Sequence, residues 1–342
     1  MASPVAWILR VSVATALVAM ALQGACSPFG SNEEEAGGES DSGTTSLPDG
    51  ATGDSGAGDA NVDAPAPDCP AGADFSSDAM NCGKCGVRCE SATCTKGVCG
   101  PTLFATVTTP LGIAVNSTAV YVVAEDNKVV WKSKTSPLNA PMDPFAGGEQ
   151  GAAYVTANDS TVCWTAKSLI RCGGLKGGTP TNFVNFTNTS LLGIARDADD
   201  SLYAADRNGF YVHFVSPDQS IQGKTIQPFG KYPEGLAFSN GDLYVAENES
   251  ASVTRYAVMT TARAAFAIGY DGPAGLAVDD TYVYVAEQFA GNVWRKRKDS
   301  SDPNDHGELL ASNQDYPSGI AVDATHVYWT NRNSGRVLRL SK

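Results

Sequence analysis

The chain has 342 residues, 42% of them hydrophobic, and a formal net charge of −13 at pH 7, which is enough material for one large repeat domain or for two to three ordinary domains. Ten acids and no base lie in residues 27–68, so removing these ten from the net charge of −13 leaves −3. The acidity therefore belongs to one segment. The rest of the chain has no basic patch with interleaved aromatics, which argues against nucleic acid as a partner.

Residues 1–25 are predicted to be a signal peptide. Their apolar run, residues 11–22, is too short to cross a bilayer as a helix. The sequence "LQGAC" that follows resembles the lipobox of bacterial lipoproteins, although Gln23 stands where that family usually has Leu. The resemblance implies lipidation of Cys26, and Ser27 beside it implies outer-membrane sorting. The alternative is ordinary cleavage after Ala25, which would leave a periplasmic or secreted chain.

Residues 26–68 carry the lipid-anchor cysteine and a segment rich in Gly, Ser, Asp and Pro with almost no large apolar side chain. Such a segment cannot bury enough surface to offset the entropy of ordering it. We therefore expect a disordered acidic tether that holds a folded domain away from a membrane.

Residues 69–100 are predicted to form a small module held by disulfides, because the segment has too few apolar residues for a core. Its six cysteines are Cys69, Cys82, Cys85, Cys89, Cys94 and Cys99. Three disulfides allow 15 pairings, and the Cys82-x-x-Cys85 spacing leaves zinc as an alternative. The pattern "NCGxCGxxC" resembles a cysteine-rich module of myxobacterial surface proteins, which implies display at the cell surface.

The remainder, residues 101–342, contains six copies of a pattern such as "SGIAVDATHVYWTN". Aligned on one glycine, the copies fall at Gly112, Gly151, Gly193, Gly235, Gly275 and Gly319. Repeats of about 40 residues with several short strands each are typical of propellers. Each copy reads as a short apolar strand, a polar turn, an aromatic and β-branched strand, and two further strands.

The sixth copy lacks a fourth strand, whereas "TLFATV" (102–107) is a strand without a copy of its own. We predict that this N-terminal strand completes the last sheet and closes a six-bladed, all-β propeller, a monomer with almost no helix. "VYWTN", "PSGIAVD" and "GRVLRL" resemble the YWTD and NHL classes of propeller. That resemblance implies the fold and leaves enzymes and binding platforms open.

Cys163 and Cys172 lie on the second and third strands of the second copy. A two-residue hairpin at Lys167-Ser168 would place them directly opposite each other. We predict a cross-strand disulfide, with two buried free thiols as the alternative.

The position predicted to follow the second strand directly, at the start of the next loop, is rich in acids. The six copies hold Glu125, Ala166, Asp206, Glu247, Glu287 and Asn331. The loop that follows opens on the same face as the entry to the first strand, so these side chains could surround one mouth of the channel. They are candidates for binding a ligand or calcium, which prefers oxygen ligands, as in propellers resembling gluconolactonase. The alternative, implied by the YWTD resemblance, is hydrogen bonding between blades.

No nucleophile elbow, phosphate-binding loop or dinucleotide fingerprint is present. Streptogramin lyases, which this chain also resembles, use a histidine, but His213, His306 and His326 pair with no visible partner and are expected to be structural or solvated. Residues 294–305, "WRKRKDSSDPND", are either a contact surface or a self-neutralising loop.

The expected function is therefore a surface-tethered, non-enzymatic binding or scaffold propeller that contacts an envelope protein or a glycan. The alternative is a metal-dependent hydrolase or lyase, resembling lactonases or streptogramin lyases, with its site at the channel mouth. The sequence names no catalytic residue and no certain cofactor.

Overall fold

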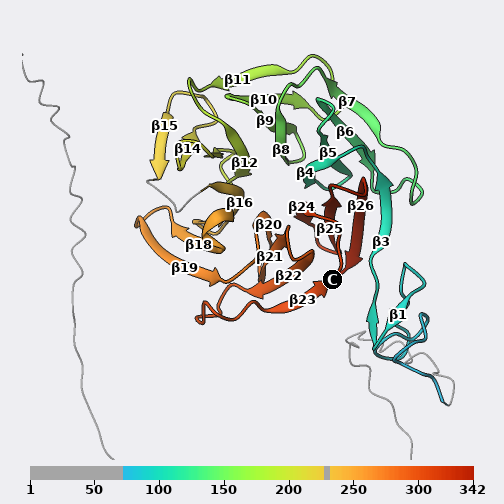
Figure 1. The fold of residues 1–342 in the computed structure, drawn as a ribbon. Helices are drawn as coiled ribbons and strands as arrows, with labels where there is room; N and C mark the ends of the chain where they lie inside the picture. The colour runs from blue at the N-terminus through green and yellow to red at the C-terminus, as the bar shows by residue number, and fades with distance from the viewer. Residues whose placement is uncertain (1–71, 227–231) are drawn as a thin grey trace, which may run out of the picture. The chain divides into compact units, whose positions relative to one another are not determined.

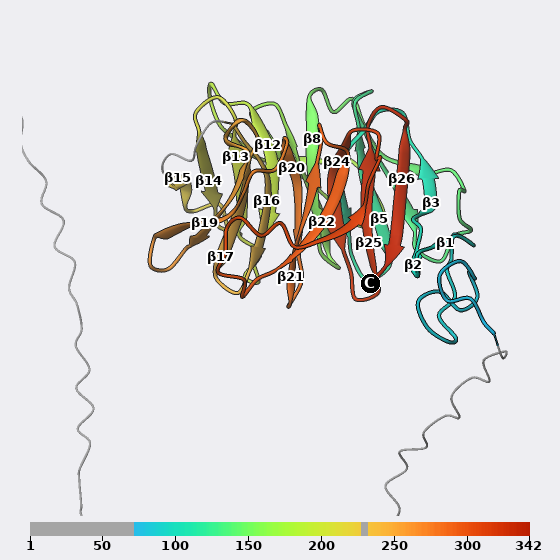
Figure 2. The same ribbon diagram turned by 60° about the horizontal axis from the view of Figure 1, so that its bottom comes forward.

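The computed structural model describes residues 72–226 and 232–342, and these contain six four-stranded antiparallel sheets around a central channel (Figure 1). Figure 2 shows the strands of each sheet running between the two faces of the ring. No helix in the described part is long and apolar enough to cross a membrane. The predicted signal peptide, Cys26, the tether and Cys69 lie outside the described residues. The fold is the predicted all-β, six-bladed propeller.

In each blade the first strand lines the channel and the fourth lies at the rim (Figure 1). Blade 1 holds β4 (Pro110–Val115), β5 (Ala119–Ala124), β6 (Lys128–Ser133) and β7 (Asp143–Gly147). Blade 2 holds β8 (Ala152–Ala157), β9 (Thr161–Ala166), β10 (Leu169–Gly174) and β11 (Thr181–Asn185). Blade 3 holds β12 (Leu191–Arg196), β13 (Leu202–Asp206), β14 (Tyr211–Val215) and β15 (Gln222–Ile226).

Blade 4 holds β16 (Pro233–Ser239), β17 (Asp242–Glu247), β18 (Ser252–Ala257) and β19 (Ala262–Ile268), with the short 3-10 helix η1 (Asn248–Ser250) between its second and third strands. Blade 5 holds β20 (Pro273–Val278), β21 (Tyr282–Glu287), β22 (Asn292–Arg297) and β23 (Glu308–Ala311). Blade 6 holds β24 (Pro317–Val322), β25 (His326–Asn331), β26 (Arg336–Ser341) and β3 (Thr102–Thr106).

The second strands form the core because each lies between two neighbouring blades. Every residue of β5 is buried. Its Tyr121 and Val123 pack with Trp164 of blade 2, whereas Val120 packs with Tyr328 of blade 6. Successive side chains of a strand point to opposite faces. A strand covered on both faces must therefore be apolar at every position, which explains the unbroken run "AVYVVA".

The ring is closed by β3, as predicted. This strand pairs antiparallel with β26, with Thr106 opposite Arg336 and Thr102 opposite Arg339. Phe104 of β3 is fully buried and packs edge-on against Tyr328, with ring centroids 5.7 Å apart. The first propeller strand of the chain therefore supplies both the hydrogen bonds and the apolar surface that blade 6 would otherwise lack.

The repeated glycines lie where adjacent first strands approach each other most closely. A Cβ added to Gly319 would lie 2.5 Å from the carbonyl oxygen of Leu111, and one added to Gly112 would lie 2.5 Å from the Cα of Tyr154. Neither approach is possible for real atoms, so the contact requires glycine. We call Gly112, Gly193, Gly235, Gly275 and Gly319 the glycine ring.

In blade 2 the predicted alignment on Gly151 is wrong by three residues. In blade 6, Ile320 directly follows Gly319 and pairs with Trp329. In blade 2, the equivalent pair is Val155 with Trp164. The residue before Val155, Tyr154, therefore occupies the glycine-ring position. Gly151 instead precedes the strand and holds a left-handed turn with φ 71°. The segment "GAAYVTA" begins with a glycine and an apolar run, as the other copies do, but its pairing register is different.

The predicted cross-strand disulfide joins Cys163 and Cys172. The two residues are directly opposite in the β9–β10 ladder, with Lys167 and Ser168 forming the hairpin turn. Their Cα atoms are 4.1 Å apart. The cysteines are therefore paired rather than free.

The cysteine-rich module is also held by disulfides. Cys82 is bonded to Cys94 and Cys89 to Cys99, and Cys85 is disulfide-bonded as well. The two-residue strands β1 (Cys94–Thr95) and β2 (Val98–Cys99) pair between them. These bonds take up the sulfurs that the alternative zinc site would need.

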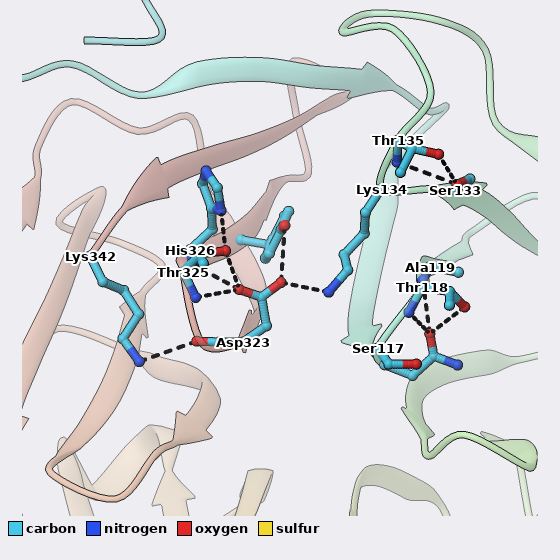
Figure 3. Close-up of polar contacts among 12 residues, drawn as sticks. Ser117, Thr118, Ala119, Ser133, Lys134, Thr135, Asp323, Thr325, His326 and Lys342 are labelled. Carbon is cyan, nitrogen blue, oxygen red and sulfur yellow. Dashed lines mark hydrogen bonds and ion pairs between the residues drawn. The ribbon is translucent and has the colours of Figure 1, made fainter. Parts of the chain in front are cut away.

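The turns between first and second strands form one face of the ring, which we call the turn face. In blade 6 the carboxylate of Asp323 accepts the backbone N–H groups of Thr325 and His326, each at 2.8 Å. It also accepts hydrogen bonds from Lys134 Nζ of blade 1 at 2.9 Å (Figure 3) and from the Tyr328 hydroxyl at 3.2 Å. The Lys134 contact links blades 6 and 1, the junction where the ring closes.

Burial alone would raise the pKa of the Asp323 carboxyl, but the Lys134 ammonium and the backbone N–H groups outweigh it and hold the pKa well below its usual range. Asp279 of blade 5 has the same arrangement with Lys342 of blade 6. There the opposing effects of burial and these donors leave the pKa at about 2. The turn face thus holds partly buried carboxylates whose pKa values are lowered.

A Gly319→Ala substitution should lower the free energy of unfolding by about 1–3 kcal/mol, because the added methyl group meets the backbone of β4. Urea unfolding measures this change. Gly147→Ala is the matched control, since no atom lies within 4 Å of its added Cβ, and it should change stability by less than about 0.5 kcal/mol. Equal effects of the two substitutions would contradict the packing argument.

An Asp323→Asn substitution should cost about 1–3 kcal/mol at pH 7, since it removes an ionised acceptor of several donors. A carboxyl with a lowered pKa in the folded state contributes stability that is complete above its unfolded pKa of about 4 and is lost as the pH falls through the folded value. The difference in free energy of unfolding between wild type and variant, measured with urea, should therefore decrease as the pH falls from 5 to 2. Asp299→Asn, at an exposed surface ion pair, should leave stability nearly unchanged at both pH values.

Candidate functional site at the channel mouth

The face opposite the turn face is built from the loops that join second to third strands and fourth to first strands, and we call it the mouth face. In every blade the residue after the second strand donates its N–H to the carbonyl of a residue in the loop before the first strand. The six pairs are Glu125 to Thr109, Lys167 to Gly151, Arg207 to Ser190, Asn248 to Tyr232, Gln288 to Gly272 and Arg332 to Tyr316, all between 2.9 and 3.2 Å. The two sets of loops therefore share one face, as predicted.

We call the six donor residues, Glu125, Lys167, Arg207, Asn248, Gln288 and Arg332, the mouth ring. Of the predicted candidates, only Glu125 belongs to it. Its side chain is about half exposed and its carboxylate binds Arg332 at 3.0 Å. Asp206, Glu247, Glu287 and Asn331 are instead the last residues of their second strands. A shift of one residue along a strand points the side chain to the other side.

These four side chains are buried and hydrogen-bond to their own blades or to the loops that join one blade to the next. Asp206 accepts the N–H of Ser190 and lies 3.4 Å from His213 Nε2. Glu247 accepts the hydroxyl of Thr254 at 3.0 Å.

Glu287 accepts the indole N–H of Trp294 at 2.8 Å. The Asn331 amide donates to Gln314 Oε1 at 3.0 Å. The structure therefore does not bring the predicted carboxylates together around the channel. Ala166, the sixth predicted position, also ends its second strand.

A different polar cluster lies at the mouth end of the channel. The Tyr154 hydroxyl of blade 2 donates to Glu234 Oε1 of blade 4 at 3.2 Å. The Gln288 amide of blade 5 donates to the same oxygen at 3.2 Å, and the Asn248 amide donates to Gln288 Oε1 at 3.5 Å. We call Tyr154, Glu234, Gln288 and Asn248 the mouth cluster. It joins three blades through one carboxylate.

The electrostatics of the mouth cluster are unusual for a partly exposed site. Burial raises the pKa of the Glu234 carboxyl, and the charges of Arg207 and Arg332 together with the hydrogen bonds from Tyr154 and Gln288 offset this in part. Burial and the neighbouring Glu234 charge raise the pKa of the Tyr154 phenol well above its usual range. A carboxyl whose pKa is raised by burial and that has specific polar and charged partners is a candidate for a functional role.

Beyond the glycine ring the channel side chains are mainly aliphatic, although Thr156 and Arg196 also line it. Its free volume of about 160 Å³ is lined mainly by aliphatic residues that follow the ring positions, such as Ile113, Val155, Leu236 and Ile320. A polar ligand group would therefore find hydrogen-bonding partners at the mouth end. Chemically, the mouth cluster offers one carboxylate acceptor, two planar amides and a phenol.

The mouth cluster does not fit the predicted calcium site. It contains one carboxylate, and the guanidinium groups of Arg207 and Arg332 act on that carboxylate. In the described part of the chain, one group of three or more potential metal ligands from His, Cys, Asp and Glu lies close enough to share an ion. It comprises Cys82, Cys89 and Cys99, whose sulfurs are in disulfides. Calcium prefers six to eight oxygen ligands, so this donor set gives no support to metal chemistry.

The three histidines all have structural contacts. His213 stacks on Phe186 with centroids 4.4 Å apart. His306 Nε2 lies 2.7 Å from the carbonyl oxygen of Ile268. His326 Nε2 lies 3.2 Å from Glu90 of the cysteine-rich module.

The charged run at residues 294–305 also satisfies its own charges. Arg297 binds Asp299 at 2.7 Å. Lys296 is fully buried and donates to the carbonyls of Phe266 and Asp302 at 2.8 and 2.6 Å. These contacts match the self-neutralising alternative, except that one of the charges is buried rather than solvated.

The sequence carried a signal for Glu234 that the repeat alignment did not use. The position before the glycine holds Leu111, Ala153, Leu192, Ala274 and Ser318 in the other blades, so Glu234 is the one carboxylate there. Tyr154 was hidden because the alignment placed Gly151 at its position. Both residues depart from the repeat, and such departures are where a repeated scaffold carries its individual chemistry.

A Glu234→Gln substitution should stabilise the fold by about 1 kcal/mol at pH 7.5. A carboxyl whose pKa is raised in the folded state contributes stability below its unfolded pKa that is lost as the pH rises through the folded value. The stability of the variant relative to wild type should therefore increase as the pH rises, and the two proteins should be equally stable near pH 4. Thermal unfolding between pH 4 and 8 measures this. Glu125→Gln, at an exposed ion pair, is the control and should show little pH dependence. Destabilisation by Glu234→Gln at pH 7.5 would contradict the assignment.

No protein-family model matches the chain, and no curated protein matches its sequence. Solved structures are similar in fold. They include virginiamycin B lyase from Staphylococcus aureus, with 17% identity over 70% of this chain and 97% of that chain and a TM-score of 0.50. Nidogen in its complex with laminin has 16% identity over 63% and 85%, with a TM-score of 0.52. A gluconolactonase from Xanthomonas campestris has 17% identity over 70% and 88%, with a TM-score of 0.57. At identities this low the likeness shows the propeller fold alone, and function must be argued from the site.

Proposed function

We propose that this chain is an exported, non-enzymatic binding propeller of the YWTD or NHL type, whose mouth cluster holds a partner from the cell envelope. The observation that carries the proposal is the chain of hydrogen bonds from Tyr154 through Glu234 to Gln288 and Asn248. These groups come from three blades and meet through one carboxylate, and a small number of convergent polar groups is typical of ligand recognition.

The proposed cellular location rests on the chemistry of the cysteines. Disulfides in the module and in blade 2 persist in oxidising compartments and are rare in the cytosol. Together with the lipobox-like sequence at Cys26, they support an outer-membrane or cell-surface lipoprotein that acts as a monomer. A periplasmic or secreted form is the alternative.

One observation favours the second candidate, a hydrolase or lyase. Glu234 has a raised pKa and lies within hydrogen-bonding distance of a phenol, an arrangement that suits general acid or base catalysis. The metal-dependent form of this candidate lacks a fitting donor set, as described above. The binding role therefore needs only the hydrogen-bonding groups of the mouth cluster and no set of metal ligands.

Binding without turnover is the expected behaviour. The purified chain, immobilised on a sensor, should bind polysaccharide or protein fractions of the cell envelope saturably. A Glu234→Ala/Gln288→Ala double variant should bind at least ten-fold more weakly, while the exposed Asp299→Asn control should bind as wild type. Mass spectrometry of the bound fraction should show no change in chain length.

Two results would count against the proposal. Equal binding by the double variant and wild type would remove the mouth cluster from the site. New reducing ends or unsaturated products would favour the hydrolase or lyase, and their loss on chelation would favour its metal-dependent form.

A further inference from the structure

An aromatic surface adjoins the mouth cluster on blades 5 and 6. Phe289 follows Gln288 of the mouth ring, and its side chain is 58% exposed. Its ring lies 5.9 Å from that of Tyr316, which is in the loop that enters blade 6. The Arg332 guanidinium lies over the Tyr316 ring at 5.9 Å. Exposure of a large apolar ring beside polar groups calls for an explanation in terms of binding.

The backbone at Tyr316 is left-handed, as it is at the equivalent place in four other blades, including Thr109 of blade 1 with φ 43°. Tyr316 has φ 61°, in the left-handed region, and Tyr232 at the equivalent place in blade 4 has φ 59°. Blades 2 and 5 have Gly151 and Gly272 at this place, with φ 71° and 69°. A bulky residue in this region costs about 1 kcal/mol or more, and such strain gathers at functional sites.

The groups around this surface have complementary shapes. Gln288, Glu234 and Arg332 all end in planar groups that form two hydrogen bonds in one plane. Arg332 lies over the Tyr316 ring, and Gln288, which bonds Glu234, directly precedes Phe289 in the chain. A pyranose sugar has the matching form, since it presents an apolar C–H face and a rim of hydroxyl groups that both donate and accept. The negative face of an aromatic ring favours such C–H groups.

We propose that the mouth face binds a glycan, with one sugar ring stacked on the exposed Phe289, the tilted ring of Tyr316 at its edge, and its hydroxyls bonded to Gln288, Glu234 and Arg332. This inference rests on the proposed binding function and names the ligand class. A similar arrangement occurs on blades 3 and 4. There the Arg207 guanidinium lies over the Tyr232 ring at 4.9 Å, and the Phe210 ring lies 5.7 Å from that of Tyr232. This arrangement provides a second place for a further sugar ring of the same chain.

The test is calorimetric titration of the full chain with four hexasaccharides: cellohexaose, laminarihexaose, chitohexaose and hexagalacturonate. At least one should bind with a Kd below about 1 mM. Phe289→Ala and Tyr316→Gly should each weaken binding at least ten-fold, and glycine suits the left-handed backbone at 316, so that the variant should remain folded. Tyr282→Ala is the matched control, because Tyr282 also has an arginine over its ring, Arg295 at 4.9 Å, but begins β21 and therefore lies at the turn face. It should bind as wild type.

The outcomes separate this inference from the proposed function. Binding that depends on Phe289 and Tyr316 supports it, and preference for hexagalacturonate over the neutral sugars would assign Arg332 to a sugar carboxylate. If none of the four sugars binds, or if the two variants bind as wild type, the inference is overturned. Should an envelope protein fraction still bind in a Glu234-dependent way, the proposed function would stand with a protein as its partner.

Discussion

The close approach of the first strands around the channel constrains the rest of this propeller. Backbone atoms of neighbouring blades meet at the glycine ring, which leaves no space for a Cβ at five of the six positions. Side chains before the ring are thereby directed to the mouth, and side chains after it fill the mainly aliphatic half of the channel. Tyr154 is the exception. Its ring takes a position that symmetry would give to glycine, and its hydroxyl reaches Glu234 two blades away.

The architecture could be predicted because its determinants are local and repeated. The aromatic second strands, the polar turns and the surplus strand at residues 102–107 all indicate a closed ring, and the hairpin at Lys167-Ser168 placed Cys163 opposite Cys172. The site could not be predicted in the same way. The repeat alignment was wrong by one residue between Glu125 and its supposed equivalents, and a shift of one residue reverses the direction of a side chain. In blade 2 the alignment was wrong by three residues, which concealed Tyr154. Patterns give periodicity more reliably than register.

The buried acids have a consistent role once the register is known. Glu247 and Glu287 accept hydrogen bonds from residues of the following strand in their own blades, and Asp323 does the same for its turn while also binding Lys134 of the next blade. These contacts fix the loops on both faces of the ring. A rigid frame of this kind lets the mouth face vary in composition without loss of the fold, which accounts for the mixture of enzymes and binding proteins among chains of similar structure.

The closure by β3 also sets the order in which the chain can assemble. β3 is the first propeller strand to be synthesised, and its partner β26 is the last, with Thr106 paired to Arg336. Blades 1 to 5 consist of consecutive strands and can form as each segment emerges, but blade 6 must wait for the whole sequence. Contacts so distant in sequence make folding slow, and an unpaired strand is prone to mispairing while it waits. The ring can therefore close only when the last strand has been made, so that β3 remains without its β26 partner throughout the synthesis of the propeller.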